Sequence, residues 1–119
     1  MAKAKGNVTY ITSETEFNKI IKKNIHVICD FFATWCGPCK KIEPEYIELS
    51  KEYKDIKFIK IDVDKLEGLS MKYKIQAMPT FIFIKDGNEL NNLRIKGANI
   101  NMIKNNIVSF LDDDTLPSE

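Results

Sequence analysis

The amino-acid sequence predicts an α/β protein in which a central mixed β-sheet carries helices on both faces, in the order βαβαβαββα. Three observations lead to this class. Strand-type and helix-type hydrophobic patterns alternate along residues 8–111. Two of the strand candidates, 25–33 and 56–63, are almost continuously apolar, which is typical of strands covered on both faces. A Lys-Asp-Gly-Asn segment at 85–88 indicates a hairpin between two later strands.

The first third of the chain predicts a strand, a helix and a second strand. A short strand is expected at 8–11. Ser13 and Glu16 then match a capping box, in which each side chain bonds a backbone N–H near the start of a helix. The helix should end near Asn24. The apolar run 25–33 follows and is predicted to be a central strand.

The middle of the chain predicts a long helix, a buried strand and a short helix. Gly37 and Pro38 open the long helix, because proline is tolerated in the first turn. Pro44 lies inside its apolar stripe and should kink the helix without ending it. The buried strand is 56–63, and the short helix is expected at 66–73.

The last third predicts two antiparallel strands and a final helix. The strands are expected at 80–84 and 89–95, on either side of the hairpin segment, and Gly97 ends them. Asn99 can cap the last helix. The early βαβ units imply parallel strands in the core, whereas the hairpin adds antiparallel strands.

Length and composition indicate one domain, 8–111, between a flexible N-terminal segment, 1–7, and an acidic tail, 112–119. The 119 residues include 18 basic and 17 acidic ones, a balance that argues against a nucleic-acid binder. No apolar run approaches the roughly 20 residues of a membrane span, and no secretory signal is recognisable. Three cysteines are too few for a disulfide-stapled secreted scaffold, so a reducing, cytoplasmic location is expected.

The segment whose residues suggest thiol–disulfide chemistry is Trp-Cys-Gly-Pro-Cys at 35–39, where the central strand runs into the long helix. Two thiols separated by two residues can close a disulfide. Cys36 falls at the helix N-terminus, where unpaired N–H groups and the helix dipole favour a thiolate, the species that attacks disulfides. Cys39 lies one turn further in, where access to solvent falls, and suits the resolving step.

Three other interpretations of the cysteine pair compete with this one. A structural disulfide over so small a loop gives only roughly 2 kcal/mol and would open in a reducing cytosol. A zinc site needs four ligands, and the other candidates, His26 and Cys29, point to opposite faces of one strand. No metal is therefore expected. Two unrelated cysteines are disfavoured by the residues that flank them.

The segment 27–40, Val-Ile-Cys-Asp-Phe-Phe-Ala-Thr-Trp-Cys-Gly-Pro-Cys-Lys, resembles the active-site segment of the thioredoxin family, in its classical WCGPC form. The resemblance covers about 8–111. It includes Lys60 in the second buried strand, Met-Pro-Thr at 78–80 and Gly-Ala at 97–98. It implies the thioredoxin fold and an enzyme that reduces protein disulfides.

The resemblance assigns roles to single residues. Cys36 matches the nucleophile and Cys39 the resolving thiol, so the two form the redox disulfide. Asp30 matches a buried carboxylate that moves the proton of the second cysteine, and Lys60 its ion-pair neighbour. Pro79 matches a cis-proline that faces the disulfide. The residues that match the rim on which a partner chain lies are Trp35, Gly37, Pro38, Ile75, Met78, Gly97 and Ala98.

The residues by themselves leave these roles open. An aspartate in a run as apolar as 25–33 is costly unless paired, and burial would raise its pKa toward neutrality. Asp30 could therefore be a base or a satisfied structural group. Lys60 could face solvent on an alternating strand. Pro79 could be an ordinary trans-proline, and Trp35 a core side chain.

Three residues depart from the family pattern. Phe32 stands where many relatives have tryptophan, and Ala77 where many have glycine. Cys29 is an additional thiol. We expect it to be a small buried side chain without a redox role.

The function predicted from this resemblance is reduction of protein disulfides by Cys36 and Cys39. No cofactor should be bound, and electrons should come from an NADPH-dependent flavoprotein thioredoxin reductase. Clients such as peroxiredoxins or ribonucleotide reductase are expected, with the protein a monomer. One alternative is a disulfide isomerase or oxidase, although the Gly-Pro between the cysteines resembles reducing members. Another is a non-catalytic interaction domain, against which the presence of Cys36, Cys39, Asp30 and Pro79 counts.

Overall fold

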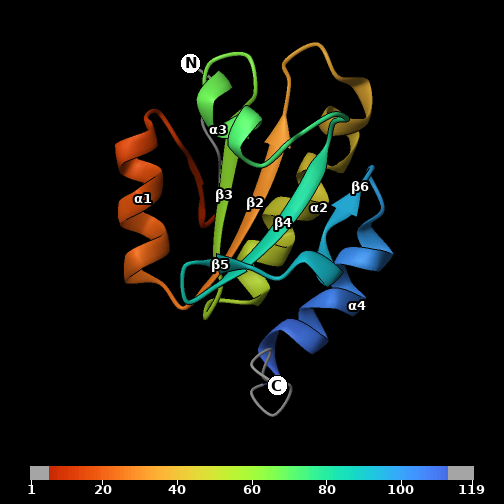
Figure 1. The fold of residues 1–119 in the computed structure, drawn as a ribbon. Helices are drawn as coiled ribbons and strands as arrows, with labels where there is room; N and C mark the ends of the chain where they lie inside the picture. Colours follow the sequence, from red (N-terminus) through yellow and green to blue (C-terminus); the bar gives the residue numbers. More distant parts are fainter. Residues whose placement is uncertain (1–5, 113–119) are drawn as a thin grey trace.

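The computed structural model describes residues 6–112 of the chain (Figure 1). Its strands are β1 (Val8–Tyr10), β2 (His26–Phe32), β3 (Lys57–Asp62), β4 (Thr80–Lys85), β5 (Asn88–Glu89) and β6 (Ile95–Lys96). Its helices are α1 (Glu14–Lys23), α2 (Gly37–Glu52), α3 (Glu67–Lys72) and α4 (Ile100–Leu111), and a 3₁₀ turn, η1, spans Asn91–Leu93. Of the predicted terminal segments 1–7 and 112–119, all but residues 6, 7 and 112 lie outside the described part.

The strands form one mixed sheet with β2 near its centre. The order is β1-β3-β2-β4-β5, with β6 also paired to β4. The pairs β1–β3 and β2–β3 are parallel, whereas β4 runs antiparallel to β2. The predicted parallel core, the later antiparallel strands and the central position of β2 are thus confirmed.

Helices flank the sheet on both faces (Figure 1). The buried hydrophobic side chains form two clusters, one on each face of the sheet. On one face, Phe17 of α1 and Leu69 of α3 pack against the sheet. On the other, α2 and α4 cover it with the fully or almost fully buried side chains Ile42, Tyr46, Leu49, Ile103, Ile107 and Phe110. Because side chains alternate along a strand, neighbours on β2 face different layers. Cys29 therefore faces α1 and α3, and Asp30 faces α2.

The N-terminus of α1 differs in one bond from the predicted capping box. The Ser13 hydroxyl accepts from the Glu16 backbone N–H at 3.0 Å, as expected. The Glu16 carboxylate, however, reaches Thr12, whose backbone N–H donates at 2.8 Å and whose hydroxyl donates at 3.1 Å. The Glu16 carboxylate thus bonds the residue before the N-cap, and not the N-cap backbone N–H as the capping box predicts.

The predicted hairpin is present, but its second strand is not continuous. The turn residues Asp86 and Gly87 both have positive φ, 52° and 83°, as a two-residue Asp-Gly turn requires. Beyond β5 the prediction of one strand at 89–95 was wrong, because η1 separates β5 from β6.

The pairings of β4 with β5 and with β6 show how long the inserted segment is. Ile84 pairs with Glu89 and Phe81 with Ile95, so three residue steps on β4 face six on the returning chain. The extra length forms η1, where Leu93 is buried. Arg94 then reaches back to Glu89 with two hydrogen bonds of 2.8 Å. Burial of Leu93 and this ion pair stabilise the bulge in place of a regular strand.

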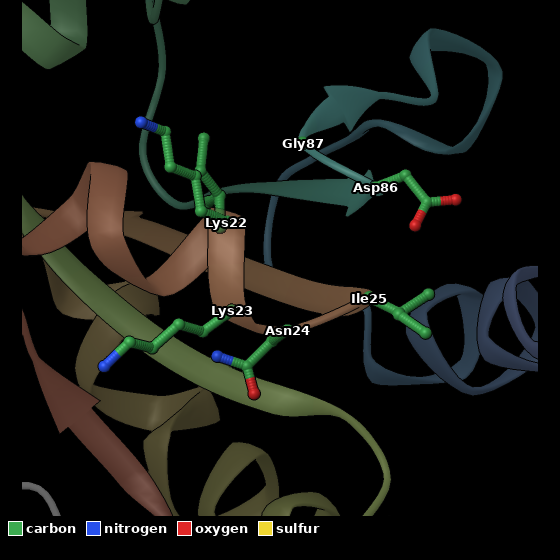
Figure 2. Close-up of a pocket in the computed structure, with 7 residues that line it drawn as sticks. Lys22, Lys23, Asn24, Ile25, Asp86 and Gly87 are labelled. Atoms are coloured by element: carbon green, nitrogen blue, oxygen red, sulfur yellow. The ribbon is translucent and has the colours of Figure 1, made fainter.

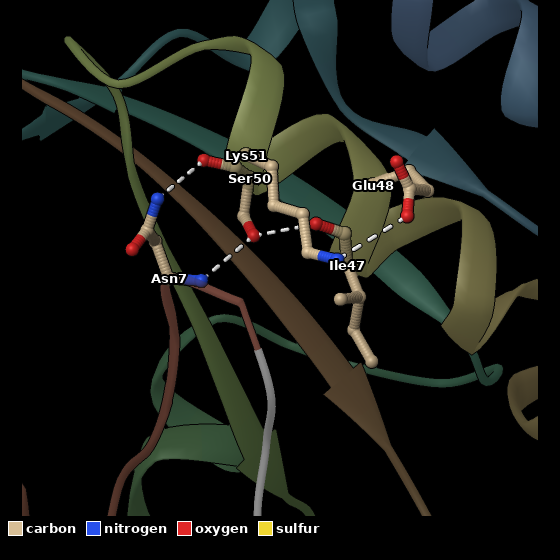
Figure 3. Close-up of polar contacts among 5 residues, drawn as sticks. All are labelled: Asn7, Ile47, Glu48, Ser50 and Lys51. Atoms are coloured by element: carbon tan, nitrogen blue, oxygen red, sulfur yellow. Dashed lines mark hydrogen bonds and ion pairs between the residues drawn. The ribbon is translucent and has the colours of Figure 1, made fainter.

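The chain enters the described domain through a contact with the C-terminal half of α2 (Figure 3). The Asn7 backbone N–H donates to the Ser50 hydroxyl at 3.0 Å, and the Asn7 side-chain amide donates to the Ser50 carbonyl at 3.0 Å. Gly6 has φ of 64°, and a Cβ there would lie 2.9 Å from the Ser50 hydroxyl. Glycine is therefore required at this close approach.

Candidate active site

The two cysteines of the motif form a disulfide across the first turn of α2. Cys36 is the N-cap of the helix and Cys39 lies in its first turn, with 5.3 Å between their Cα atoms. The Cys39 backbone N–H donates to the Cys36 sulfur at 3.2 Å. Both cysteines are almost fully buried in this oxidised state. An N–H aimed at Cys36 is the local feature that favours negative charge on this sulfur once the disulfide is reduced.

The sheet brings Pro79 to the same end as the disulfide. Thr80 pairs with Phe31, so β4 begins beside the end of β2, from which the chain continues to Cys36. The Met78–Pro79 peptide bond is cis, as the resemblance implies. The Gly97 backbone N–H donates to the Pro79 carbonyl at 2.8 Å. This bond joins two of the residues assigned to the site.

Asp30 is the buried carboxyl group of the site. It is fully buried on β2 and lies opposite Lys60 in the parallel pairing with β3. Neither of its carboxylate oxygens has a hydrogen-bond partner among the described residues. Burial raises the pKa of Asp30 from 3.8 to about 7, against a lowering by the Lys60 charge. Asp30 can therefore exchange a proton near neutral pH.

Lys60 is buried, not solvent-facing, and its ammonium contacts a different carboxylate from the one implied by the resemblance. Its Nζ lies 3.0 Å from the Glu43 carboxylate and 4.2 Å from the centre of the Phe32 ring. The Tyr10 ring lies 5.2 Å away. The expected Lys60–Asp30 ion pair is thus replaced by one with Glu43, on α2.

A small cavity opens beside this ion pair. Its volume is about 180 Å³. Its lining includes Cys39, Glu43 and Lys60, together with the aromatic side chains Tyr10 and Phe32. Cys39 and the Lys60–Glu43 pair therefore share one opening to the surface.

Trp35 is a surface residue, not a core side chain. Its side chain is 66% exposed, and its indole N–H donates to the Asp64 carboxylate at 2.9 Å. The Asp64 backbone N–H in turn donates to Asp62 at 2.9 Å. Sequence reasoning missed Asp64 and Glu43. The available signals were an indole N–H that needs an acceptor and a carboxylate four residues after Cys39, on the same face of the helix.

The remaining predicted rim residues divide into two groups. Gly37 and Pro38 are exposed beside Cys36 in the chain, and Ala98 is exposed after β6. Ile75, Met78 and Gly97 are half-buried, and Ile75 and Met78 pack against the α1–α3 core layer. A side chain at Gly37 would meet no atom within 4 Å, so the backbone there is open to an approaching chain.

The third cysteine lies within β2 and forms no disulfide. Cys29 is fully buried in the layer under α1 and α3, and burial raises the pKa of its thiol well above the ordinary value. His26 packs edge-on against Phe110 of α4, with ring centres 4.8 Å apart. The two groups lie on opposite sides of the sheet. In residues 6–112 no cluster of three or more histidine, cysteine or acidic side chains is placed to hold a metal.

A second cavity lies at the far end of the sheet from the disulfide (Figure 2). Its volume is about 430 Å³, and it is lined by the end of α1, by Asn24 and Ile25 between α1 and β2, and by the β4–β5 turn. The charged residues Lys22, Lys23 and Asp86 are among those that line it. None of the predicted site residues lines it. No helix within 6–112 combines the length and apolar character needed to cross a membrane.

A disulfide across the first turn of a helix, beside a cis-proline and next to a strand with a buried carboxyl group, defines a thiol–disulfide oxidoreductase of the thioredoxin fold. Comparisons with known proteins agree with this class. The family model described as Thioredoxin matches residues 8–112, so the chain belongs to the thioredoxin family. Members of this family are protein-disulfide reductases.

Relatives are similar over most of the chain. Thioredoxin 1 of Plasmodium falciparum (isolate 3D7) is 46% identical over 103 residues, which cover 87% of this chain and 97% of that protein. The crystal structure of Schistosoma mansoni thioredoxin is 43% identical, with a TM-score of 0.82, and the match covers 88% of this chain and 96% of that one. A yeast structure that concerns the thiol resolving mechanism of a mitochondrial 1-Cys peroxiredoxin via glutathione/thioredoxin systems is 38% identical, with a TM-score of 0.80 and coverage of 86% and 94%.

Proposed function

We propose that the protein is a general reductant of protein disulfides in which Cys36 is the nucleophile and Cys39 the resolving thiol. The Cys36 thiolate attacks one sulfur of a client disulfide, and the other client sulfur leaves as a thiolate and takes up a proton. The Cys39 thiolate then attacks the Cys36 sulfur and releases the second client sulfur. Two electrons pass to the client, and the Cys36–Cys39 disulfide is left. The position of Cys36 at the N-cap of α2 carries this proposal.

Asp30 is the proposed base for the second step. Cys39 must lose its proton inside a site that excludes most water, and a carboxyl group with a pKa of about 7 can accept it at neutral pH. Burial supports this role, because it makes ionised Asp30 a stronger base than an exposed aspartate.

The proposed client surface is the rim around the disulfide. Pro79 and Gly97 are joined by a backbone bond, and Gly37 leaves its backbone open. A client chain would lie against these residues and against the exposed face of Trp35. The Asp64 carboxylate holds the Trp35 indole in a fixed orientation. Such a preformed surface reduces the ordering cost of binding.

Partners and location follow from the family. We propose that an NADPH-dependent flavoprotein thioredoxin reductase supplies the two electrons in trans, so that the monomeric chain binds no cofactor. Clients would include ribonucleotide reductase and peroxiredoxins, and the similar yeast structure that concerns a 1-Cys peroxiredoxin supports the second of these. A reducing compartment such as the cytoplasm suits this chemistry.

The proposal is tested by a trapping experiment. Reduced Cys39→Ser protein should accumulate a mixed disulfide with a disulfide-bonded client, such as insulin, through Cys36. Mass spectrometry of the adduct identifies the attached residue. Cys36→Ser is the matched control and should trap nothing. Release of client by Cys39→Ser as fast as by the parent protein would contradict the two-step mechanism.

The reduction potential separates the reductase from an oxidase or isomerase. Equilibration with glutathione buffers, followed by alkylation, gives the fraction of closed Cys36–Cys39 disulfide. A reductant should have a potential at or below the cytosolic glutathione poise of about −220 to −260 mV. A potential above about −200 mV would instead support the oxidase alternative.

A further inference from the structure

The position of Lys60 has a consequence for Asp30. The two residues are paired neighbours on adjacent strands, and both side chains are buried on the face that α2 covers. The Lys60 ammonium is nevertheless bound to Glu43 at 3.0 Å, whereas the Asp30 carboxylate has no hydrogen-bond partner among the described residues. The cation nearest to Asp30 along the sheet is therefore engaged elsewhere.

Glu43 is placed to do this by the helix. It lies four residues after Cys39 on α2, so both side chains leave the same face of the helix, one turn apart. The side chain of Glu43 is 32% exposed and that of Lys60 is 3% exposed. The Lys60 ammonium also lies over the aromatic rings of Phe32 and Tyr10. Glu43 thus holds the cation at the mouth of the cavity that Cys39 also lines.

We propose that Glu43 is a positioning residue that, by binding Lys60, prevents this cation from neutralising Asp30 and so keeps Asp30 able to accept the proton of Cys39 near neutral pH. The inference rests on the base role proposed above for Asp30. It adds a residue that does not contact the reacting sulfurs and acts through another side chain.

The charges around Asp30 determine the direction of the effect. β3 contributes Lys60, whose charge lowers the Asp30 pKa, and α2 contributes Glu43, whose charge raises it. α2 also carries Cys39, a disulfide sulfur in this state, and the buried hydroxyl of Tyr46. On the other side of β2, the partner residue on β4 is the apolar Phe81. Loss of the Glu43 charge removes the raising contribution and frees Lys60, so both changes lower the Asp30 pKa.

The test is a titration of the Asp30 carboxyl carbon by ¹³C NMR in the oxidised protein, where neither cysteine of the pair titrates. Glu43→Gln keeps the size of the side chain and should lower the Asp30 midpoint by about one pH unit. Glu45→Gln removes an exposed charge from the same helix and should leave the midpoint unchanged. Lys60→Met, of similar length and suited to the aromatic surroundings, should raise it.

The double variant Glu43→Gln/Lys60→Met distinguishes positioning from direct repulsion. If Glu43 acts through Lys60, Glu43→Gln should shift the midpoint much less when Lys60 is absent. An unchanged midpoint in Glu43→Gln, or an equal shift with and without Lys60, overturns the inference. In the reduced protein, the rate of mixed-disulfide resolution should fall at low pH. The pH of this fall should shift together with the Asp30 midpoint in each variant. If the rate of resolution does not follow the Asp30 titration, or is unaffected by Asp30→Asn, the proposed base role fails while the NMR result on Glu43 stands.

Discussion

At the scale of single residues, the buried carboxyl group of Asp30 links its proposed role as a base to the stability of the fold. Asp30 in an unfolded chain would ionise near pH 3.8, but in the fold it holds its proton up to about pH 7. Between these values the unfolded state binds fewer protons than the folded state. The free energy of unfolding therefore falls as pH rises from about 4 to about 7, and the loss is complete above that range.

Asp30→Asn should consequently stabilise the fold at alkaline pH while slowing client release. The shift from 3.8 to about 7 corresponds to a gain of up to about 4 kcal/mol at pH 8, which disappears near pH 4. Urea unfolding of the oxidised parent and variant proteins at about pH 4 and about pH 8 measures this difference in the free energy of unfolding. Asp55→Asn, at an exposed position, controls for loss of one negative charge. A gain of equal size at both pH values would show that proton linkage is not the cause.

Cys29 is the residue that the family pattern does not explain. It is fully buried on the α1–α3 face, and burial raises the pKa of its thiol. A bulky thiol reagent should therefore modify no cysteine in the oxidised native protein and one after denaturation in urea. Cys29→Val, of similar size, should keep full reductase activity. Prompt modification of Cys29 in the native protein would instead indicate a redox-sensitive thiol.

At the scale of elements, the N-terminus of α2 makes the two cysteines unequal. The Cys36 sulfur lies at the N-terminus of the helix, where the dipole and the Cys39 N–H favour negative charge, whereas Cys39 lies inside the first turn. Alkylation of the reduced protein across pH, followed by peptide mapping, should label Cys36 well before Cys39 near neutral pH. Preferential labelling of Cys39 would reverse the assignment of nucleophile and resolving thiol.

Elements with a local signal were predictable, and those set by distant contacts were not. The caps at Ser13 and Asn99 and the Asp86–Gly87 turn depend on neighbouring residues, and all three are present. The break between β5 and β6 depends on the burial of Leu93 and on the bond from the Asn106 side chain to its carbonyl at 2.8 Å. The alternating pattern of residues 89–95 does not indicate that this segment contacts α4, so the break could not be predicted from it.

The site shows the same division. The two cysteines are only three positions apart in the sequence, so their place at a helix N-terminus could be predicted from the motif. The partner of Lys60 could not, because Asp30 and Glu43 are both carboxylates within reach and only the packing of α2 on the sheet selects between them. The Trp35–Asp64 bond likewise depends on how the chain leaves β3.

At the scale of the whole molecule, the parallel strands place all the chemistry at one end. β2 and β3 both end beside the disulfide, and β4 begins there. The other end of the sheet holds the β4–β5 turn and the cavity of Figure 2. The parallel core, the later antiparallel strands and the helices on both faces could be predicted from the alternation of elements, since βαβ units and a hairpin leave few arrangements.

The described chain leaves the domain at that second end, because Leu111 of α4 and His26 at the start of β2 line the same surface depression. β2 separates this depression from the strand end that leads to Cys36, and its seven residues span about 20 Å. An anchor attached beyond Leu111 would therefore hold the protein by the end remote from its disulfide. Molecules tethered to a solid support in this way would turn the proposed client surface around Trp35 toward the solution.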